Sequence, residues 1–221
     1  MKEPNRERKT DIKYNITLNT EQKEAKRLII ENQIVIITGQ AGTGKSLISA
    51  QVALDFLFKK QIDNIYVTRA AIEVGKSLGF LPGGLGEKFN PYMEALIENL
   101  YKCKDKPTID KIVEEGQIKA LPIQYIRGKT VSDILICEES QNVTKGEILA
   151  ILTRLGKTGK MIFNGDLQQC DVRNNGEING LEYLIELSKK IPEIKWIKLK
   201  ENHRSDLVGK ILQYEFEGKL N

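Results

Sequence analysis

Short apolar runs alternate with longer stretches of mixed polarity along most of the chain. The runs are uninterrupted and rich in β-branched residues, a pattern typical of strands that are covered on both faces in a parallel sheet. In the stretches between them, apolar residues recur at the spacing of an amphipathic helix. The pattern predicts strands at 34–38, 65–67, 134–137, 161–163 and 196–199, and helices at 45–59, 147–155, 181–189 and 208–216.

This alternation predicts an α/β fold built from right-handed βαβ units, with a parallel sheet and helices on both of its faces. The 221 residues suit a single domain, which we expect at 17–221 after a flexible, polar N-terminal arm at 1–16. One long connection, at about 69–130, interrupts the alternation between the second and third strands. It contains turn residues and helical stretches at 91–101 and 109–115. We interpret it as an insertion on the functional edge of the sheet, because connections of this length in a compact domain usually carry function.

The composition is that of a soluble globular protein, with 40% hydrophobic and 29% charged residues. The formal net charge of +4 is spread along the chain, so it permits nucleic-acid binding without indicating it. The apolar runs are too short to cross a bilayer, and the charged N-terminus has no signal-peptide pattern. We therefore expect a cytoplasmic protein with no membrane partner.

Cysteine and histidine are too few to carry the chemistry. The three cysteines lie far apart without a C-x-x-C pair, which disfavours a disulfide framework and a thiolate zinc site. His203 is the single histidine and no nucleophile elbow is present, so a Ser-His-Asp triad is also disfavoured. The chemistry left to the chain uses carboxylates, lysine, arginine and a phosphate-bound metal.

Residues 39–46 fit the phosphate-loop pattern G-x-x-x-x-G-K-[ST], directly after a predicted strand and before a predicted helix. Glycines let backbone N–H groups approach phosphate oxygens, and the helix N-terminus presents further N–H groups to the same anion. We expect Lys45 to contact the β- and γ-phosphates and Ser46 to bind Mg²⁺. A glycine-rich turn with a chance lysine is disfavoured by the complete pattern. The predicted ATP-binding residues of the loop are Gly39, Gln40, Ala41, Gly42, Thr43, Gly44, Lys45 and Ser46.

Two glutamates follow the predicted strand 134–137, where ligands gather in open α/β sheets. A phosphate-loop enzyme needs one acid near the metal and a base that orients the attacking water. We assign Glu138 to the Mg²⁺ shell, although an aspartate is more usual there, and Glu139 to the water. The alternative is a pair of acids on a solvated loop. Because small-molecule kinases usually lack a water-activating glutamate here, Glu139 favours hydrolysis over phosphoryl transfer.

A polar segment, Asn-Gly-Asp-Leu-Gln-Gln, ends the next predicted strand. A side chain at this place can contact both the γ-phosphate and the attacking water. Gln169 is our candidate, with Gln168 one residue away. The alternative is an ordinary Asn-Gly-Asp turn.

Taken together, these motifs resemble the PhoH family of phosphate-loop ATPases, which is related to the ATPase core of superfamily 1 helicases. The resemblance spans about 18–212, and two departures from the family pattern stand out: Glu138 replaces the usual aspartate, and Ser140 stands where alanine is common. Beyond the phosphate loop, the resemblance rests on Val67-Thr68-Arg69-Ala70, Glu73-Val74-Gly75, Leu78-Gly79-Phe80-Leu81-Pro82-Gly83, Asn90-Pro91-Tyr92, Arg127-Gly128-Lys129-Thr130, Glu139, Gln141-Asn142, Leu152-Thr153-Arg154 and Gly165-Asp166.

The resemblance implies a single RecA-like domain, ATP binding with Mg²⁺, ATPase activity and ring-shaped homo-oligomers, with a hexamer expected. It also implies action on RNA or single-stranded DNA. Gln22 resembles the glutamine that reads adenine in related helicases; equally, it can cap a helix that starts after Asn19. Arg204 resembles the family's late arginine, which in a ring could reach the γ-phosphate of a neighbouring subunit. The alternative for Arg204 is a surface residue that opens the last helix.

A nucleic-acid surface is predicted at Arg69, Arg127 and Lys129, whose phosphate contacts would make binding sensitive to salt. The aromatic residues of the insertion are favoured as core or subunit contacts over base-stacking partners. Three hypotheses remain: an ATP hydrolase that acts on nucleic acid as a ring, a slow ATP-gated assembly module, and a less favoured small-molecule phosphotransferase.

Overall fold

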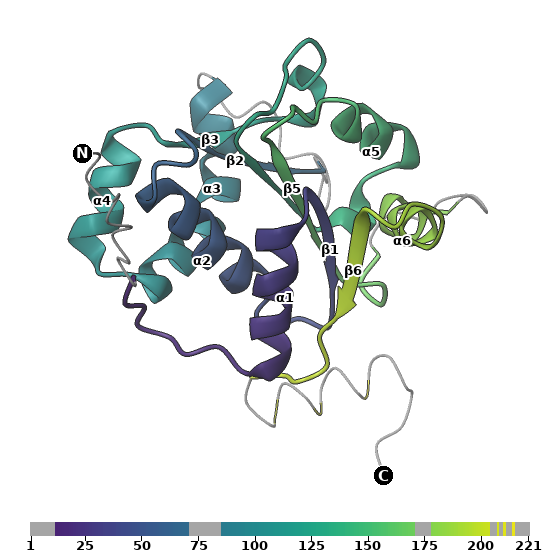
Figure 1. Ribbon diagram of the computed structural model, residues 1–221, viewed down its shortest axis with the longest axis horizontal. Helices are drawn as coiled ribbons and strands as arrows, with labels where there is room; N and C mark the ends of the chain where they lie inside the picture. The colour runs from purple at the N-terminus through teal and green to yellow at the C-terminus, as the bar shows by residue number, and fades with distance from the viewer. Residues whose placement is uncertain are drawn as a thin grey trace, which may run out of the picture.

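The computed structural model describes residues 12–70, 85–170 and 178–203, together with 207, 210 and 214; for 85–92 it describes the backbone alone. Within these residues the chain forms a six-stranded sheet in the order β3-β2-β4-β5-β1-β6, and neighbouring strands pair in parallel (Figure 1). The strands are β1 (Ile34–Thr38), β2 (Ile65–Arg69), β3 (Ile118–Ala120), β4 (Ile134–Glu138), β5 (Lys160–Gly165) and β6 (Ile194–Lys198).

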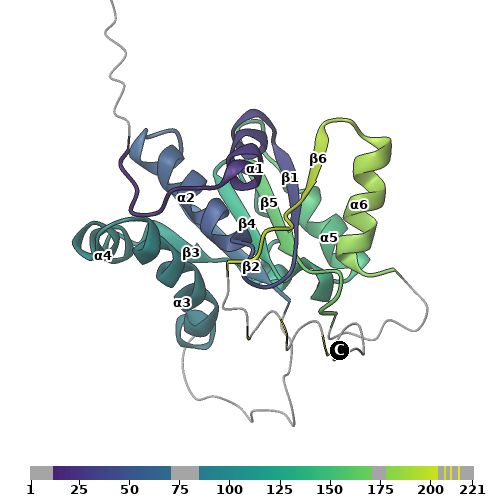
Figure 2. The ribbon, with the colours of Figure 1, turned by 90° about the horizontal axis from the view of Figure 1, so that it is seen from below.

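Helices cover both faces of the sheet. Figure 2 shows α2, α3 and α4 on one side of the strands and α5 and α6 on the other. The helices are α1 (Thr20–Glu31), α2 (Lys45–Phe58), α3 (Leu85–Cys103), α4 (Lys106–Glu114), α5 (Lys145–Leu152) and α6 (Gly180–Lys190), with short 3-10 helices η1 (Ile123–Tyr125) and η2 (Ser140–Asn142). This α/β arrangement is the predicted fold class.

Two apolar cores explain why the strand sequences are continuously hydrophobic. In β1, Val35 and Ile37 pack into the core under α1 to α4, whereas Ile36 packs into the core under α5 and α6. The residues of this central strand thus alternate between two helix layers, because successive side chains of a strand point to opposite faces. No helix among the described residues is long and apolar enough to cross a membrane.

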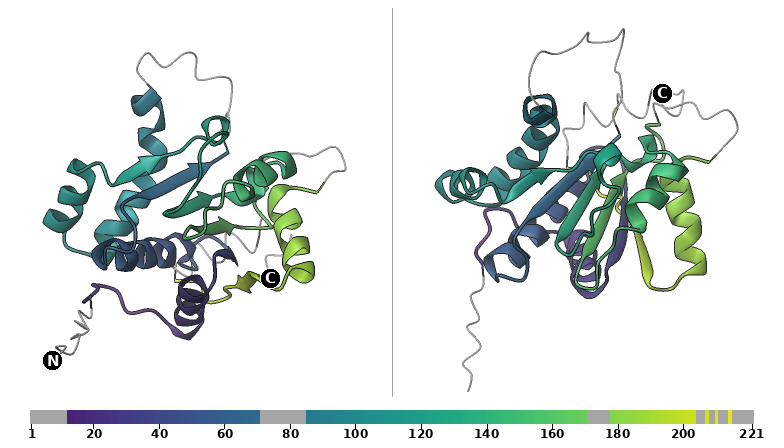
Figure 3. Two further views of the ribbon diagram at one scale, coloured as in Figure 1. Left: turned by 45° about the horizontal axis from the view of Figure 1, so that its top comes forward. Right: turned by 90° about the horizontal axis from the view of Figure 1, so that it is seen from above.

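The connection predicted as an insertion contributes more to the sheet than its sequence indicates. Its described residues form α3, α4 and the short strand β3, which pairs with β2 and extends the sheet (Figure 3). The sequence analysis missed β3, because three residues are too few to display a strand period. Helix α4 begins at Lys106 rather than at 109, because the Asp105 carboxylate caps it by accepting from the Thr108 N–H at 3.1 Å. The predicted helix 208–216 lies outside the described residues, apart from 210 and 214.

The end of the predicted arm that the structure describes packs on the domain. The Tyr14 hydroxyl donates to the Asp55 carboxylate at 2.5 Å, and Asp55 also pairs with Lys26 at 2.6 Å. The Asn15 N–H donates to the carbonyl oxygen of Cys103 at 3.0 Å. Residues 12–16 therefore connect α1, α2 and the end of α3.

Candidate functional site

The loop between β1 and α2 turns tightly against its neighbours. The Gly39 N–H donates to the Gly165 carbonyl at 3.3 Å, and a Cβ at Gly39 would lie 2.8 Å from the Leu199 carbonyl oxygen. Gly44 has φ +89°, and a Cβ there would lie 2.6 Å from Nε2 of Gln22. Glycine is thus favoured at both positions, by space against the backbone at Gly39 and by the left-handed backbone conformation at Gly44. Lys45 folds over this loop, and its Nζ donates to the Gly39 carbonyl at 2.6 Å.

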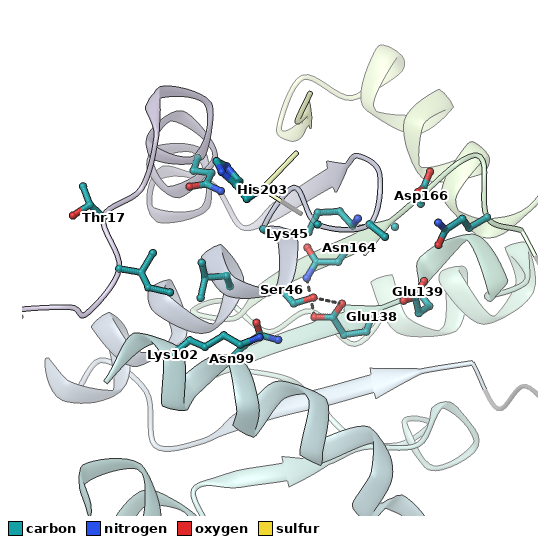
Figure 4. Close-up of a pocket in the computed structure, with 18 residues that line it drawn as sticks. Thr17, Lys45, Ser46, Asn99, Lys102, Glu138, Glu139, Asn164, Asp166 and His203 are labelled. Atoms are coloured by element: carbon teal, nitrogen blue, oxygen red, sulfur yellow. Dashed lines mark hydrogen bonds between the residues drawn. The ribbon is translucent and has the colours of Figure 1, made fainter. Parts of the chain in front are cut away.

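A chain of polar contacts connects the start of α2 with the ends of β4 and β5. The Ser46 hydroxyl donates to Oε2 of Glu138 at 2.9 Å, and Nδ2 of Asn164 donates to Oε1 of the same carboxylate at 2.9 Å (Figure 4). Burial raises the pKa of Glu138 and outweighs the hydrogen bonds from Asn164 and Ser46, which lower it. The site therefore holds an acid whose negative charge is incompletely compensated by the protein.

Glu139 follows with an unusual backbone, at φ 51° and ψ 47° in the left-handed region. This conformation is uncommon for a residue with a side chain and often occurs at functional sites. Nε2 of Gln141 donates to Oε2 of Glu139 at 2.6 Å. The same amide nitrogen donates to the Gln169 carbonyl at 3.0 Å. The two predicted water-side residues, Glu139 and Gln169, are therefore held by one common neighbour.

Residues of the phosphate loop and the two glutamates line a pocket of about 590 Å³, a volume typical of small-molecule sites. Figure 4 shows Lys45, Ser46, Glu138, Glu139 and Asp166 gathered toward one end of it. The rest of the wall includes Ile16, Thr17, Gln22, Asn99, Lys102 and His203. The pocket thus has one end lined by the phosphate loop and carboxylates and another formed by the N-terminal segment, α1 and α3.

Gln22 lies where both of its predicted roles are geometrically open. Asn19 and Gln22 form a reciprocal capping box at the start of α1, which confirms the capping role. The buried Gln22 side chain also lines the pocket, and its Nε2 donates to the Thr43 carbonyl at 3.1 Å. One amide hydrogen and one oxygen lone pair remain for a ligand.

The three basic residues predicted for nucleic acid do not gather at the pocket. Arg69 ends β2 in register with Glu138, close to the pocket but outside its lining. Nζ of Lys129 lies 4.2 Å from the ring centroid of Tyr66, on the α5 and α6 side of the sheet. Arg127 lines a separate groove beside α5 with Arg154. Arg204 lies outside the described residues.

Several pocket residues were missed by the sequence analysis. Asn164 lies at the end of β5 and Asp166 directly follows the strand, and the buried Oδ2 of Asp166 has no hydrogen-bond partner among the residues that the structure describes. The sequence analysis singled out their segment as one that can contact the γ-phosphate and the attacking water, but it took Gln169 as the candidate and gave Asn164 and Asp166 no role. Asn99 and Lys102 come from α3, and nothing local in the sequence marks them. Among the described residues, no group of three or more His, Cys, Asp or Glu side chains could hold a metal ion.

The family model described as PhoH-like protein matches residues 16–215 of the chain. A PhoH-like protein of Mycobacterium tuberculosis is 37% identical over 209 residues, covering 91% of this chain and 58% of the relative. A PhoH-like protein of Bacillus subtilis is 37% identical over 195 residues, covering 87% of this chain and 61% of the relative. The matched region is thus about three-fifths of the length of these relatives.

Solved structures share the fold at low sequence identity. The large terminase of a thermophilic bacteriophage has a TM-score of 0.54 at 10% identity, over 90% of this chain and 50% of the terminase. The Pif1 helicase of Candida albicans has a TM-score of 0.51 at 19% identity, over 93% of this chain and 45% of the helicase. These similarities support the RecA-like phosphate-loop fold.

Proposed function

The chain belongs to the PhoH-like protein family, and on that premise we propose that it binds ATP together with Mg²⁺ and hydrolyses the terminal phosphate. The observation that carries the proposal is the 2.9 Å contact between Ser46, at the start of α2, and Glu138, at the end of β4. It joins the hydroxyl of the phosphate-loop motif to an acid on a separate strand, as a nucleotide-bound metal requires.

The phosphate loop supplies the binding groups for the triphosphate. The N-terminus of α2 offers N–H groups and the positive end of its dipole to an anion. Lys45 exchanges its contacts with the Gly39 and Gln40 carbonyls, at 2.6 and 3.1 Å, for phosphate oxygens. The N-terminus of α2 and the Lys45 ammonium group therefore both place positive charge where the β- and γ-phosphates would lie.

The residues beside the loop fit Mg²⁺, which prefers oxygen ligands and usually keeps waters and substrate phosphates in its shell. Ser46 and Glu138 would hold the ion, and its positive charge would offset the burial that raises the pKa of Glu138. When bound, the ion would neutralise charge that develops on the β- and γ-phosphates.

Glu139 orients the attacking water, and Gln169 contacts the γ-phosphate from the end of the neighbouring parallel strand β5. Both line the pocket beside Ser46 and Glu138. Gln22 lines the pocket beside Thr43 of the phosphate loop and reads the adenine base through its remaining amide hydrogen and lone pair.

We further infer that the protein forms a homo-oligomeric ring, expected to be a hexamer, in which Arg204 reaches the γ-phosphate of the neighbouring subunit. RNA or single-stranded DNA is the proposed macromolecular substrate. Of the predicted contacts, Arg69 is the favoured one, because it ends β2 beside Glu138, whereas Arg127 and Lys129 lie on the α5 side. Nucleic acid at Arg69 would adjoin the site of hydrolysis, and the cytoplasm is the expected compartment.

The testing experiment measures ATP turnover with and without single-stranded RNA and DNA, with Lys45→Ala as the blank. Turnover that polymer raises at low salt, and that the blank lacks, supports the ATPase with its nucleic-acid substrate. A turnover rate that neither polymer changes supports the ATPase and rejects nucleic acid as its substrate. A wild-type rate equal to that of the blank rejects hydrolysis.

A second candidate, a slow ATP-gated assembly module, is favoured by the glutamate at 138 and its raised pKa. Glu138→Asp separates the two, because an aspartate would restore the acid that is usual in this position. A turnover gain of about tenfold or more would favour the gated module, whereas an equal or lower rate favours the ATPase as the chain stands.

A further inference from the structure

Gln141 is an almost fully buried side chain at the junction of two strand ends. It lies in η2, the short helix that follows Glu138 and Glu139, and only 1% of its surface is exposed. It does not line the pocket. Its role therefore depends on the hydrogen bonds that its amide group makes to neighbouring segments.

The amide makes three hydrogen bonds to two segments. Nε2 uses both of its hydrogens, one toward the Glu139 carboxylate at 2.6 Å and one toward the Gln169 carbonyl at 3.0 Å. Oε1 accepts from the Asp166 N–H at 3.0 Å. One side chain thus connects the acid after β4 to both ends of the segment 166–169 after β5.

The surroundings leave little freedom for another arrangement. A Cβ at Gly165 would lie 2.9 Å from Oε1 of Gln141, so the strand end approaches the amide more closely than any other residue would allow. The left-handed backbone of Glu139 aims its carboxylate back toward this amide. Rotation of the Gln141 amide would break all three bonds together, because donor and acceptor would exchange places.

We propose that Gln141 is a positioning residue that fixes the Glu139 carboxylate and the Gln169 segment as one unit against the γ-phosphate. The proposal rests on the ATPase proposed above. Water oriented by Glu139 and phosphate contacted by Gln169 then keep one relative geometry through each turnover. A displacement of about 1 Å in such a geometry can cost about a hundredfold in rate.

The test is Gln141→Glu, which keeps the size and the acceptor toward Asp166 but removes both donors and sets a like charge beside Glu139. We expect kcat to fall about 30- to 100-fold while the KM for ATP stays within about threefold. The matched control is Gln33→Glu. Nε2 of Gln33 also donates to backbone carbonyls, those of Gly156, Lys157 and Gly159, but outside the pocket, so kcat should stay within about twofold.

A reciprocal exchange tests the contact itself without relying on turnover. In the double variant Glu139→Gln/Gln141→Glu, donor and acceptor change sides and the like charges are removed. Gln141→Glu should lower the melting temperature by about 3–6 °C, and we expect the double variant to recover part of this loss, because the bond to residue 139 is remade while the bond to the Gln169 carbonyl stays lost. The double variant stays inactive because residue 139 is no longer an acid. Should Gln141→Glu not fold, Gln141→Met removes the same donors without a charge and is judged by the same kcat and KM limits.

The outcomes separate this proposal from the ATPase proposal. If the wild type hydrolyses ATP but kcat of the Gln141 variants stays within twofold, or KM rises as much as kcat falls, positioning by Gln141 is overturned. If the melting temperatures of the single and double variants are simply additive, the contact with Glu139 is overturned even when the rates change. If the wild type does not hydrolyse ATP, the ATPase proposal fails, and positioning for that reaction fails with it, whatever the melting temperatures show.

Discussion

Replacement of Glu138 by glutamine removes a charge while it preserves the shape of the site. Among the described residues, the carboxylate accepts hydrogen bonds from the Ser46 hydroxyl and the Asn164 amide, both at 2.9 Å. A glutamine oxygen can still accept from Asn164, and its NH₂ can donate to the Ser46 hydroxyl, which rotates to accept. Glu138→Gln therefore isolates the free energy of holding a negative charge beneath the phosphate loop.

The expected change in stability follows from the raised pKa of Glu138, whose main cause is burial. A carboxyl group whose pKa is raised on folding favours the folded state while it is protonated, and this contribution is lost as pH rises through the folded pKa. An effective penalty of several kcal/mol for a buried ion is offset by two charge-assisted hydrogen bonds of about 1.5–3 kcal/mol each. Without nucleotide, we expect the free energy of unfolding of the variant to be higher than that of the wild type by on the order of 1 kcal/mol near pH 8. Near pH 4 we expect no difference between the two proteins.

Urea unfolding of both proteins across this pH range, without nucleotide or metal, measures the difference. A free-energy gap that does not change with pH, or a more stable wild type near pH 8, would refute the reasoning. With Mg²⁺ and ATP the order should reverse, because the variant loses about 10- to 100-fold in affinity for the metal-bound nucleotide. ATP titrations with and without Mg²⁺ give this second measurement, and equal affinities would contradict the metal role.

Three further predictions address the water, the scaffold and a reporter of binding. Glu139→Gln should lower single-turnover hydrolysis by about 10²- to 10⁴-fold and leave the ATP dissociation constant within about threefold; an unchanged rate would reject the water role. Lys160→Met should lower the free energy of unfolding by on the order of 2 kcal/mol in urea titrations, because the ammonium group donates to three carbonyls at the end of α1 at 2.8–2.9 Å; a loss below about 0.5 kcal/mol would contradict this. Trp196, the single tryptophan, donates to Thr38 beside the phosphate loop at 2.9 Å, so ATP should change its fluorescence in the wild type and much less in Lys45→Ala.

The central strands were predictable because burial on both faces leaves a visible mark in the sequence. In β4, Ile134 and Ile136 enter one core and Leu135 and Cys137 the other, so the whole run is apolar. The capping box at Asn19 was predictable for a similar reason, since its partners lie within one helical turn. Local rules of spacing are sufficient where all the interacting residues lie close together in the chain.

The pocket wall from α3 could not be predicted in the same way. Asn99 and Lys102 line the pocket because α3 packs against α2, a long-range contact without a sequence period of its own. The amide network of Gln141 is also hidden, because its partners at 166 and 169 follow a different strand. Which strand ends are adjacent depends on the order of the sheet.

The separation of the basic residues has a topological cause. Right-handed crossovers between parallel strands put connections that run toward β3 on one face and connections that run toward β6 on the other. The chain from β3 to β4 runs in the second direction, past β2, and so falls on the α5 and α6 side. Lys129 over the ring of Tyr66 is the direct result. Arg69 ends a strand whereas Arg127 and Lys129 precede one, and the direction of the crossover separates them further by placing the latter two on the α5 and α6 side.

The same rule explains why the site forms at the end of β1. From β1 the chain passes through α2 to β2, on the β3 side of the sheet, whereas β5 connects through α6 past β1 to β6. The two crossovers lie on opposite faces and leave a crevice at the carboxyl end of β1, where ligands bind in open α/β sheets. The adjacent strand β5 brings Asn164 and Asp166 to this crevice, and β4 beside it brings Glu138 and Glu139. Side chains 92 residues apart, such as Ser46 and Glu138, therefore meet because the winding direction changes at β1. The phosphate loop could thus be read from the sequence, but its partners required the strand order.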